Sequence, residues 1–108
     1  MATIKNLTID QGSRYQLNIT VQGIPNLTGF QARGMIRKHK ADAIVLADIT
    51  ASLSVDVPNS FVVVDIAAAT TAGYNWSTGV YDIEVYSGAT VYRVLQGNVN
   101  IDEEVTRT

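Results

Sequence analysis

The feature that most constrains this chain is the strict alternation of apolar and polar residues along residues 13–22. Apolar and polar side chains take turns there in the order Arg14, Tyr15, Gln16, Leu17, Asn18, Ile19, Thr20 and Val21. Successive side chains of a strand point to opposite faces, so the pattern predicts a strand with one buried and one solvated face. The chain therefore needs a sheet that covers a core on one side.

Further strand-like segments follow at intervals of roughly ten residues, separated by turn residues. They span residues 4–9, 30–38, 44–49, 51–57, 61–66, 80–86 and 90–96. The apolar run 44–49 is interpreted as a strand buried on both faces. Together with 51–57 and 61–66 it is expected to form hairpins. A second hairpin is expected around Ser87-Gly88-Ala89.

Glycines mark the turns and irregularities of these strands. Asp10-Gln11-Gly12 predicts a turn between the first two strands, because Gly accepts a positive φ. Gly34 inside a strand pattern indicates a bulge or a close backbone approach. Gly97-Asn98 predicts a bend before Val99 and Ile101.

One segment departs from the strand pattern. Residues 67–73 are small, helix-tolerant residues that end in Gly73, and they predict one or two helical turns that cross between sheets. Short strands joined by frequent turns are typical of a two-sheet antiparallel sandwich of about seven to eight strands. The 108 residues suit one such domain, spanning 1–108.

Composition narrows the classes of function. The chain has no cysteine, which excludes disulfides and thiolate chemistry. Eight Lys and Arg against ten Asp and Glu give a formal charge of -2, which disfavours a nucleic-acid partner. The first ten residues lack the apolar stretch of a secretory signal, and nothing resembles a membrane span, so folding in a cytoplasm is expected.

The chemistry-bearing residues do not form a recognisable catalytic pattern. His39 is the only histidine, so any Ser-His-Asp arrangement depends on it, and a solvated loop histidine is the simpler interpretation. Asp82 and Glu84 share one face of a strand and could help to bind Ca²⁺, or they could form a solvated strand face. The sequence predicts no catalytic residue, no metal site and no cofactor.

Two clusters are candidates for a protein interface. The basic tip Arg37-Lys38-His39-Lys40 could contact an acidic partner, or simply keep a hairpin loop soluble. Tyr74 and Trp76 could close one end of the core or anchor a partner. Tyr81 is placed like the tyrosine that in many Greek-key sandwiches bonds back to the preceding corner.

The order of these elements resembles the N-terminal domain of the baseplate upper proteins of tailed bacteriophages. The match covers nearly the whole chain and rests on residues 9–12, 27–30, 32–38, the Ala-Thr crossover, 79–84, 91–97 and 104–107. The resemblance implies an immunoglobulin-like sandwich that docks onto a larger phage assembly. This sequence ends where those proteins continue into a further domain, which raises the alternative of an accessory or decoration subunit.

The expected function is therefore that of a non-enzymatic virion structural protein, assembled in several copies on a tail or baseplate. Its partners would be other virion proteins, with residues 1–9 and 99–108 as candidates for strand exchange. The alternatives are a capsid decoration or cement protein bound to the major capsid protein, and a carbohydrate-binding module in which Tyr74, Trp76 and Tyr86 stack on sugars.

Overall fold

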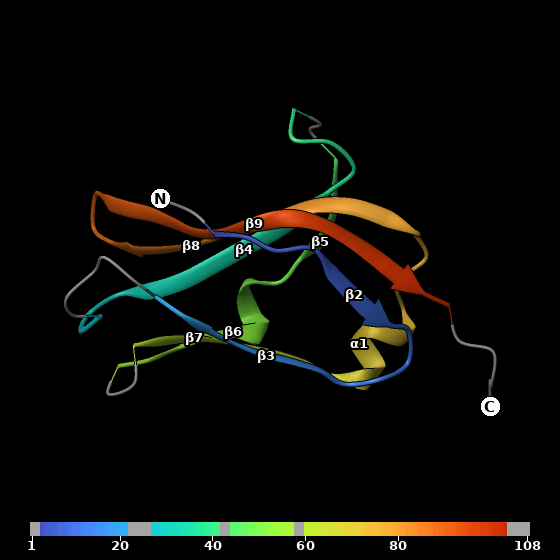
Figure 1. Cartoon of the computed structure of the whole chain (residues 1–108), viewed down its shortest axis with the longest axis horizontal. Helices are drawn as coiled ribbons and strands as arrows, with labels where there is room; N and C mark the ends of the chain where they lie inside the picture. The colour runs from blue at the N-terminus through green and yellow to red at the C-terminus, as the bar shows by residue number, and fades with distance from the viewer. Residues whose placement is uncertain (1–2, 22–26, 42–43, 58–59, 104–108) are drawn as a thin grey trace.

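The computed structural model describes residues 3–21, 27–41, 44–57 and 60–103, which form two β-sheets packed face to face (Figure 1). The fold is an all-β, immunoglobulin-like sandwich. The described residues contain nine strands, slightly more than expected, because the first predicted strand is divided at Lys5 and Asn6 into β1 (Thr3–Ile4) and β2 (Leu7–Asp10).

The larger sheet has six strands. Its order is β1, β9 (Thr90–Asp102), β8 (Thr78–Ser87), β4 (Gln31–Arg37) and β5 (Val45–Asp48), with β2 also pairing with β9. β1 and β2 run parallel to β9, and all other pairs in this sheet are antiparallel. The β8–β9 hairpin turns at Gly88, whose φ of 58° only glycine adopts freely.

The smaller sheet has three antiparallel strands in the order β3 (Tyr15–Thr20), β7 (Phe61–Ile66) and β6 (Leu53–Asp56). The alternating run identified in the sequence is β3, and its prediction as a strand is confirmed. Connections pass between the layers after β2, after β3, through the 3₁₀ turn η1 (Thr50–Ser52), and through α1 (Ala68–Ala72).

The predicted helical crossover is confirmed: α1 links β7 to β8 and lies at one end of the sandwich (Figure 1). Thr71 of α1 is completely buried. Its hydroxyl donates to the Ser13 carbonyl oxygen at 2.8 Å and accepts from the Gly12 amide at 3.0 Å. The predicted turn at Gly12 (φ 84°) is thereby fixed to the helix. No described helix has the length and apolar character needed to span a membrane.

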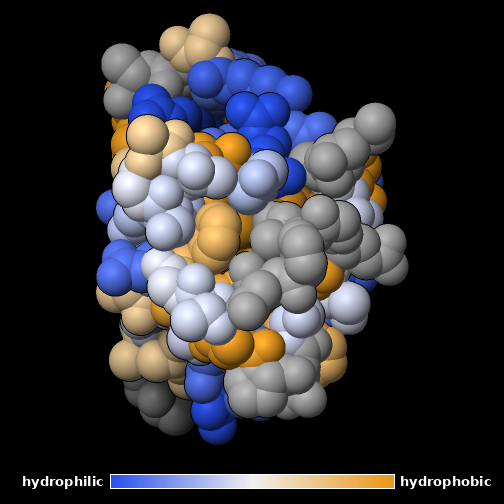
Figure 2. All heavy atoms as spheres, turned by 90° about the vertical axis from the view of Figure 1, so that its left-hand side faces the viewer, coloured by the Kyte–Doolittle hydropathy of each residue, from blue (hydrophilic) through white to orange (hydrophobic). Residues whose placement is uncertain are grey.

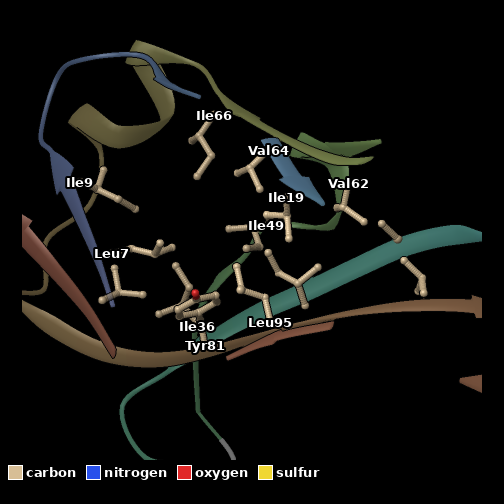
Figure 3. Close-up of a cluster of buried hydrophobic side chains, with 14 of the residues drawn as sticks. Leu7, Ile9, Ile19, Ile36, Ile49, Val62, Val64, Ile66, Tyr81 and Leu95 are labelled. Carbon is tan, nitrogen blue, oxygen red and sulfur yellow. The ribbon is translucent and has the colours of Figure 1, made fainter. Parts of the chain in front are cut away.

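The core lies between the two layers and consists of the inward residues of both sheets. Figure 3 shows Ile19, Val62, Val64 and Ile66 of the smaller sheet facing Ile36, Tyr81 and Leu95 of the larger one. Leu7 and Ile9 reach the same core from β2, and Ile49 reaches it just before η1. Burial alternates strictly along β4 and β8, so each strand has one buried and one outer face.

Two features of the predicted strands are wrong. The run 44–49 is not buried on both faces, because its middle forms β5 (Val45–Asp48) at the edge of the larger sheet, where Val45 is 39% exposed. It pairs with β4 rather than with the strand at 51–57. Gly97 makes no bend, because it lies inside the continuous strand β9. A Cβ there would overlap the carbonyl group of Lys5, so the glycine serves a close backbone approach.

Gly34 also serves a close approach rather than a bulge. A Cβ at this position would lie 2.9 Å from the Asp82 carbonyl oxygen and 3.1 Å from Ile49. The register of β4 on β5 shifts elsewhere, between Ile36 and Arg37. The prediction of a tyrosine corner is wrong as well: the Tyr81 hydroxyl donates to the Lys5 carbonyl oxygen, far from the preceding corner, because Tyr81 faces the N-terminal segment across β9.

Candidate protein interface

The solvent-facing side of the six-stranded sheet, called the outer face here, carries a group of exposed side chains that interact with one another. The strand registers define it, because cross-strand partners share a face. Its side chains are those of Ile4, Gln31, Arg33, Met35, Arg37, Val45, Asp48, Val80, Asp82, Glu84, Tyr86, Val91, Arg93 and Gln96.

Arg33 is held in place by two neighbours on β8. Its Nε lies 2.9 Å from Oε1 of Glu84, directly across the strand pair, and its guanidinium lies 4.5 Å from the ring centre of Tyr86. The Tyr86 hydroxyl donates in turn to Oε1 of Gln31 at 2.9 Å. Each contact at an exposed site is weak, but together they fix the plane of the guanidinium.

A second group lies on β8 and β9. Arg93 Nε is 3.4 Å from Oδ2 of Asp82, and its Nη1 is 3.4 Å from Oε1 of Gln96. Asp82 and Glu84 share a face as the sequence predicted, and an arginine is paired with each carboxylate. Among the described residues no three His, Cys, Asp or Glu side chains gather as metal ligands would.

The outer face contains a depression of about 320 Å³. Its lining includes four cationic residues, Arg33, Arg37, Lys40 and Arg93, against two carboxylates, Asp82 and Glu84. The chain as a whole carries a formal charge of -2, so the depression has the opposite sign of charge to the protein. An acidic group of a partner is the ligand that such a surface favours.

Two residues of the predicted basic tip, Arg37 and Lys40, line this depression. Arg37 ends β4, whereas Lys38, His39 and Lys40 are exposed in the loop that leads to β5. Hydrophilic residues gather at the top of the end view in Figure 2, at the height of this loop in Figure 1. The sequence therefore found one border of the site. His39 makes no hydrogen bond or ion pair with a described residue.

Apolar side chains are exposed between the charged ones. Ile4 is 74% exposed, Met35 38%, Val45 39% and Val91 43%. Ile4 and Met35 lie in the same row across the sheet, which passes through Gln96 and Asp82. The outer face thus combines apolar contact area with fixed charges.

Tyr74 and Trp76 lie at the other end of the molecule from the β8–β9 turn, just before β8. Tyr74 is only 9% exposed, and its ring packs 5.1 Å from that of Trp76, so the interpretation that they close the core is confirmed. The Trp76 Nε1 atom is buried without a hydrogen-bond partner in the described part of the chain. Tyr86 sits near the far end of β8, so these three aromatic residues form no common stacking platform.

The sequence analysis did not predict that Arg33, Met35, Glu84 and Arg93 belong to one surface, nor that Arg33 pairs with Glu84. The signal was present, because these residues occupy the outward positions of predicted strands. What the sequence does not give is the strand order, which places β4 beside β8 and β8 beside β9.

The fold and this surface together define an immunoglobulin-like domain with a charged and apolar sheet face suited to protein contacts. A scan against protein-family models gives no match to the chain, and a search of curated proteins gives none either.

Proposed function

We infer that this chain is a structural subunit of a tailed-phage virion, which docks through its outer face onto a tail or baseplate protein. The observation that carries this proposal is the composition of the outer face. Arg33, Arg37, Arg93, Met35 and Tyr86 all lie on it. Arg, Met and Tyr are residue types that are enriched in protein interfaces, and the carboxylates Asp82 and Glu84 on the same face are each paired with an arginine.

Side chains of the outer face are already held in place before a partner binds, and this lowers the entropy cost of docking. A side chain that is already held loses less conformational entropy when a partner binds it. Arg33 is held by Glu84 and Tyr86, and Arg93 by Asp82 and Gln96. The two arginines can therefore accept an acidic partner group without first being ordered.

The resemblance to baseplate upper protein domains supports assembly on a tail or baseplate. The positive charge of the depression on the outer face supports an acidic partner. A partner of acidic character would be steered to the depression, which Lys40 lines, and to the exposed Lys38 beside it. Ile4, Met35 and Val91 would supply the apolar contact area that charges alone lack.

The first experiment asks whether the chain belongs to the particle. Quantitative mass spectrometry of purified virions is expected to find it in a fixed ratio to the tail proteins. Antibody labelling seen by electron microscopy is expected on the tail or baseplate. Label on the head would support capsid decoration instead, and a chain missing from the particle would contradict both proposals.

The second experiment tests the docking surface. Labelled chain is added to particles assembled without it, and the bound fraction is measured after sedimentation. Met35→Glu adds a negative charge to the lining of the depression and is expected to weaken binding at least about tenfold, because it repels the acidic group of the proposed partner. Val57→Glu is the control, because Val57 is exposed to nearly the same extent, 39%, beyond the end of β6. Equal binding of the two variants would exclude the outer face.

A further inference from the structure

The outer edge of the smaller sheet is an open strand. β3 pairs with β7 through the whole of Tyr15–Thr20, and in the described part of the chain no strand pairs with its other side. The register is regular, without a bulge. Such an edge presents a row of backbone donors and acceptors to any strand that approaches it.

The pairing pattern identifies the backbone groups that point outward. Continued by one residue, the register places Val21 opposite Ser60, and the Val21 amide donates to the Ser60 carbonyl oxygen at 2.9 Å. Hydrogen-bonded pairs alternate along an antiparallel ladder, so Ile19, Leu17 and Tyr15 also bond to β7. The amide and carbonyl groups of Gln16, Asn18 and Thr20 therefore point away from the sheet.

The other described edges are better protected against strand addition. The N-terminal edge is divided at Lys5 and Asn6 between β1 and β2. β5 and β6 have four residues each, and they end in Asp48 and Asp56. Short edge strands and edge charges are common protections, and β3 has neither of them.

We propose that two copies of this chain pair through β3, in antiparallel orientation, to form one continuous six-stranded sheet across a two-fold axis. The strand is self-complementary when Asn18 lies opposite Asn18 of the second copy. Gln16 then faces Thr20, and all three residues present outward backbone groups on both copies.

The side chains favour the same arrangement. No residue of Tyr15–Thr20 is charged, and the nearby Arg14 is directed to Asp65 on β7 by two bonds of 2.8 and 2.7 Å. On the inner side, Tyr15 and Leu17 are only partly buried in the single chain. In the pair, Leu17 faces Ile19 of the second copy, so apolar surface becomes covered on both sides.

The test is sedimentation velocity of the whole chain over a roughly thousandfold concentration range, together with amide hydrogen exchange at both extremes. A dimer is expected at high concentration. The amides of Gln16, Asn18 and Thr20 are expected to exchange rapidly in dilute samples and slowly in concentrated ones. Those of Leu17 and Ile19 should be protected in both, because β7 already accepts them.

Asn18→Lys puts like charges opposite each other and is expected to weaken the dimer at least about tenfold. Ser54→Lys is the matched control, because it adds the same charge to the exposed face of β6 at the other edge of the same sheet. Mixing Asn18→Lys with Asn18→Asp chains should restore a mixed dimer, which also shows that both variants are folded.

Three results would overturn the proposal. They are a monomer at every concentration, a dimer that Asn18→Lys leaves unchanged, and protection of the Gln16, Asn18 and Thr20 amides only after phage particles are added. The last result would assign the edge to a different protein. None of these outcomes depends on the outer face, so the two proposals stand or fall separately.

Discussion

The Tyr81 hydroxyl donates a hydrogen bond of 2.6 Å to the backbone carbonyl oxygen of Lys5, at the point where the N-terminal segment passes from β1 to β2. Tyr81 lies opposite Gly97 of β9, and because Gly97 has no side chain, the Tyr81 ring can extend past β9 to Lys5. The Lys5 amide donates to the Gln96 carbonyl oxygen at 2.8 Å, and the Asn98 amide donates to Oδ1 of Asn6 at 3.1 Å. These contacts attach the first strands to the larger sheet.

Tyr81→Phe should lower the free energy of unfolding by about 1–3 kcal/mol, because the Lys5 carbonyl loses its phenolic donor in a partly buried place. Urea denaturation at neutral pH measures the change. Tyr86→Phe is the control, since its hydroxyl bonds to Gln31 at an exposed site. A loss for Tyr86→Phe as large as that for Tyr81→Phe would contradict the role of the buried bond.

Alkaline pH should destabilise the protein through the same residue. Burial, and then the neighbouring Tyr15, raise the pKa of Tyr81 well above its ordinary value. The unfolded chain releases this proton above a pH of about 10, whereas the folded chain retains it, so stability falls as the pH rises beyond that value. Unfolding free energies between neutral and alkaline pH should fall less steeply for Tyr81→Phe. Parallel curves would contradict this assignment.

Gly97→Ala should detach the N-terminal segment, because a Cβ at this position overlaps the Lys5 carbonyl group. We expect a loss of about 1–3 kcal/mol, the usual cost of inserting a methyl group into a packed site. Amide exchange of Lys5 reports on the detachment. Gly73→Ala is the control, because its φ of -82° and its nearest contact of 3.5 Å accept a methyl group.

Thr71→Val should destabilise the end of the sandwich by about 1–3 kcal/mol. The isosteric change removes the hydroxyl that accepts from Gly12 and donates to Ser13, in a fully buried position. Thr71→Ser keeps the hydroxyl and should recover most of this loss. Thermal unfolding of the three proteins compares them directly, and a serine variant no better than valine would refute the hydrogen-bond explanation.

The Arg14–Asp65 pair should make stability depend on acidic pH. The Arg14 guanidinium donates hydrogen bonds to the Asp65 carboxylate, and these hold the pKa of Asp65 below its ordinary value. A lowered pKa means that the contribution is complete above a pH of about 4 and is lost as the pH falls through the folded-state pKa. Carbon-detected titration of the Asp65 carboxyl measures the shift directly. Adding salt should reduce it, because the pair is exposed.

The local patterns in the sequence were sufficient for the strands that have one solvated face. β3 and β8 alternate clearly, and the β8–β9 turn follows from its glycine. The helical crossover was also predictable, because small residues ending in Gly73 contrast with the β-branched strands around them.

The errors share one physical cause, which is that long-range partners decide what a local pattern leaves open. The run at 44–49 has the residues of a buried strand, but among the residues that the structure describes no element covers its outer side once it pairs with β4. A glycine at position 97 is compatible with a bend in the chain or with the close approach of a neighbouring backbone. Only the position of the Lys5 carbonyl group shows that the second case applies. The outer face also depends on long-range partners, because Arg33 meets Glu84 only when β4 pairs with β8.

The parallel pairing of β2 with β9 has a consequence for the order of folding during synthesis. β9 is the last described strand to be made, yet it lies between the N-terminal strands and β8 in the larger sheet. Leu7 and Ile9 leave the ribosome long before β9, and their pairing partners Val99 and Ile101 are not available until residue 101 has emerged. The nascent chain must therefore carry the apolar segment of β2 unpaired while the strands between β2 and β9 are made, which is a period when binding by chaperones is favoured.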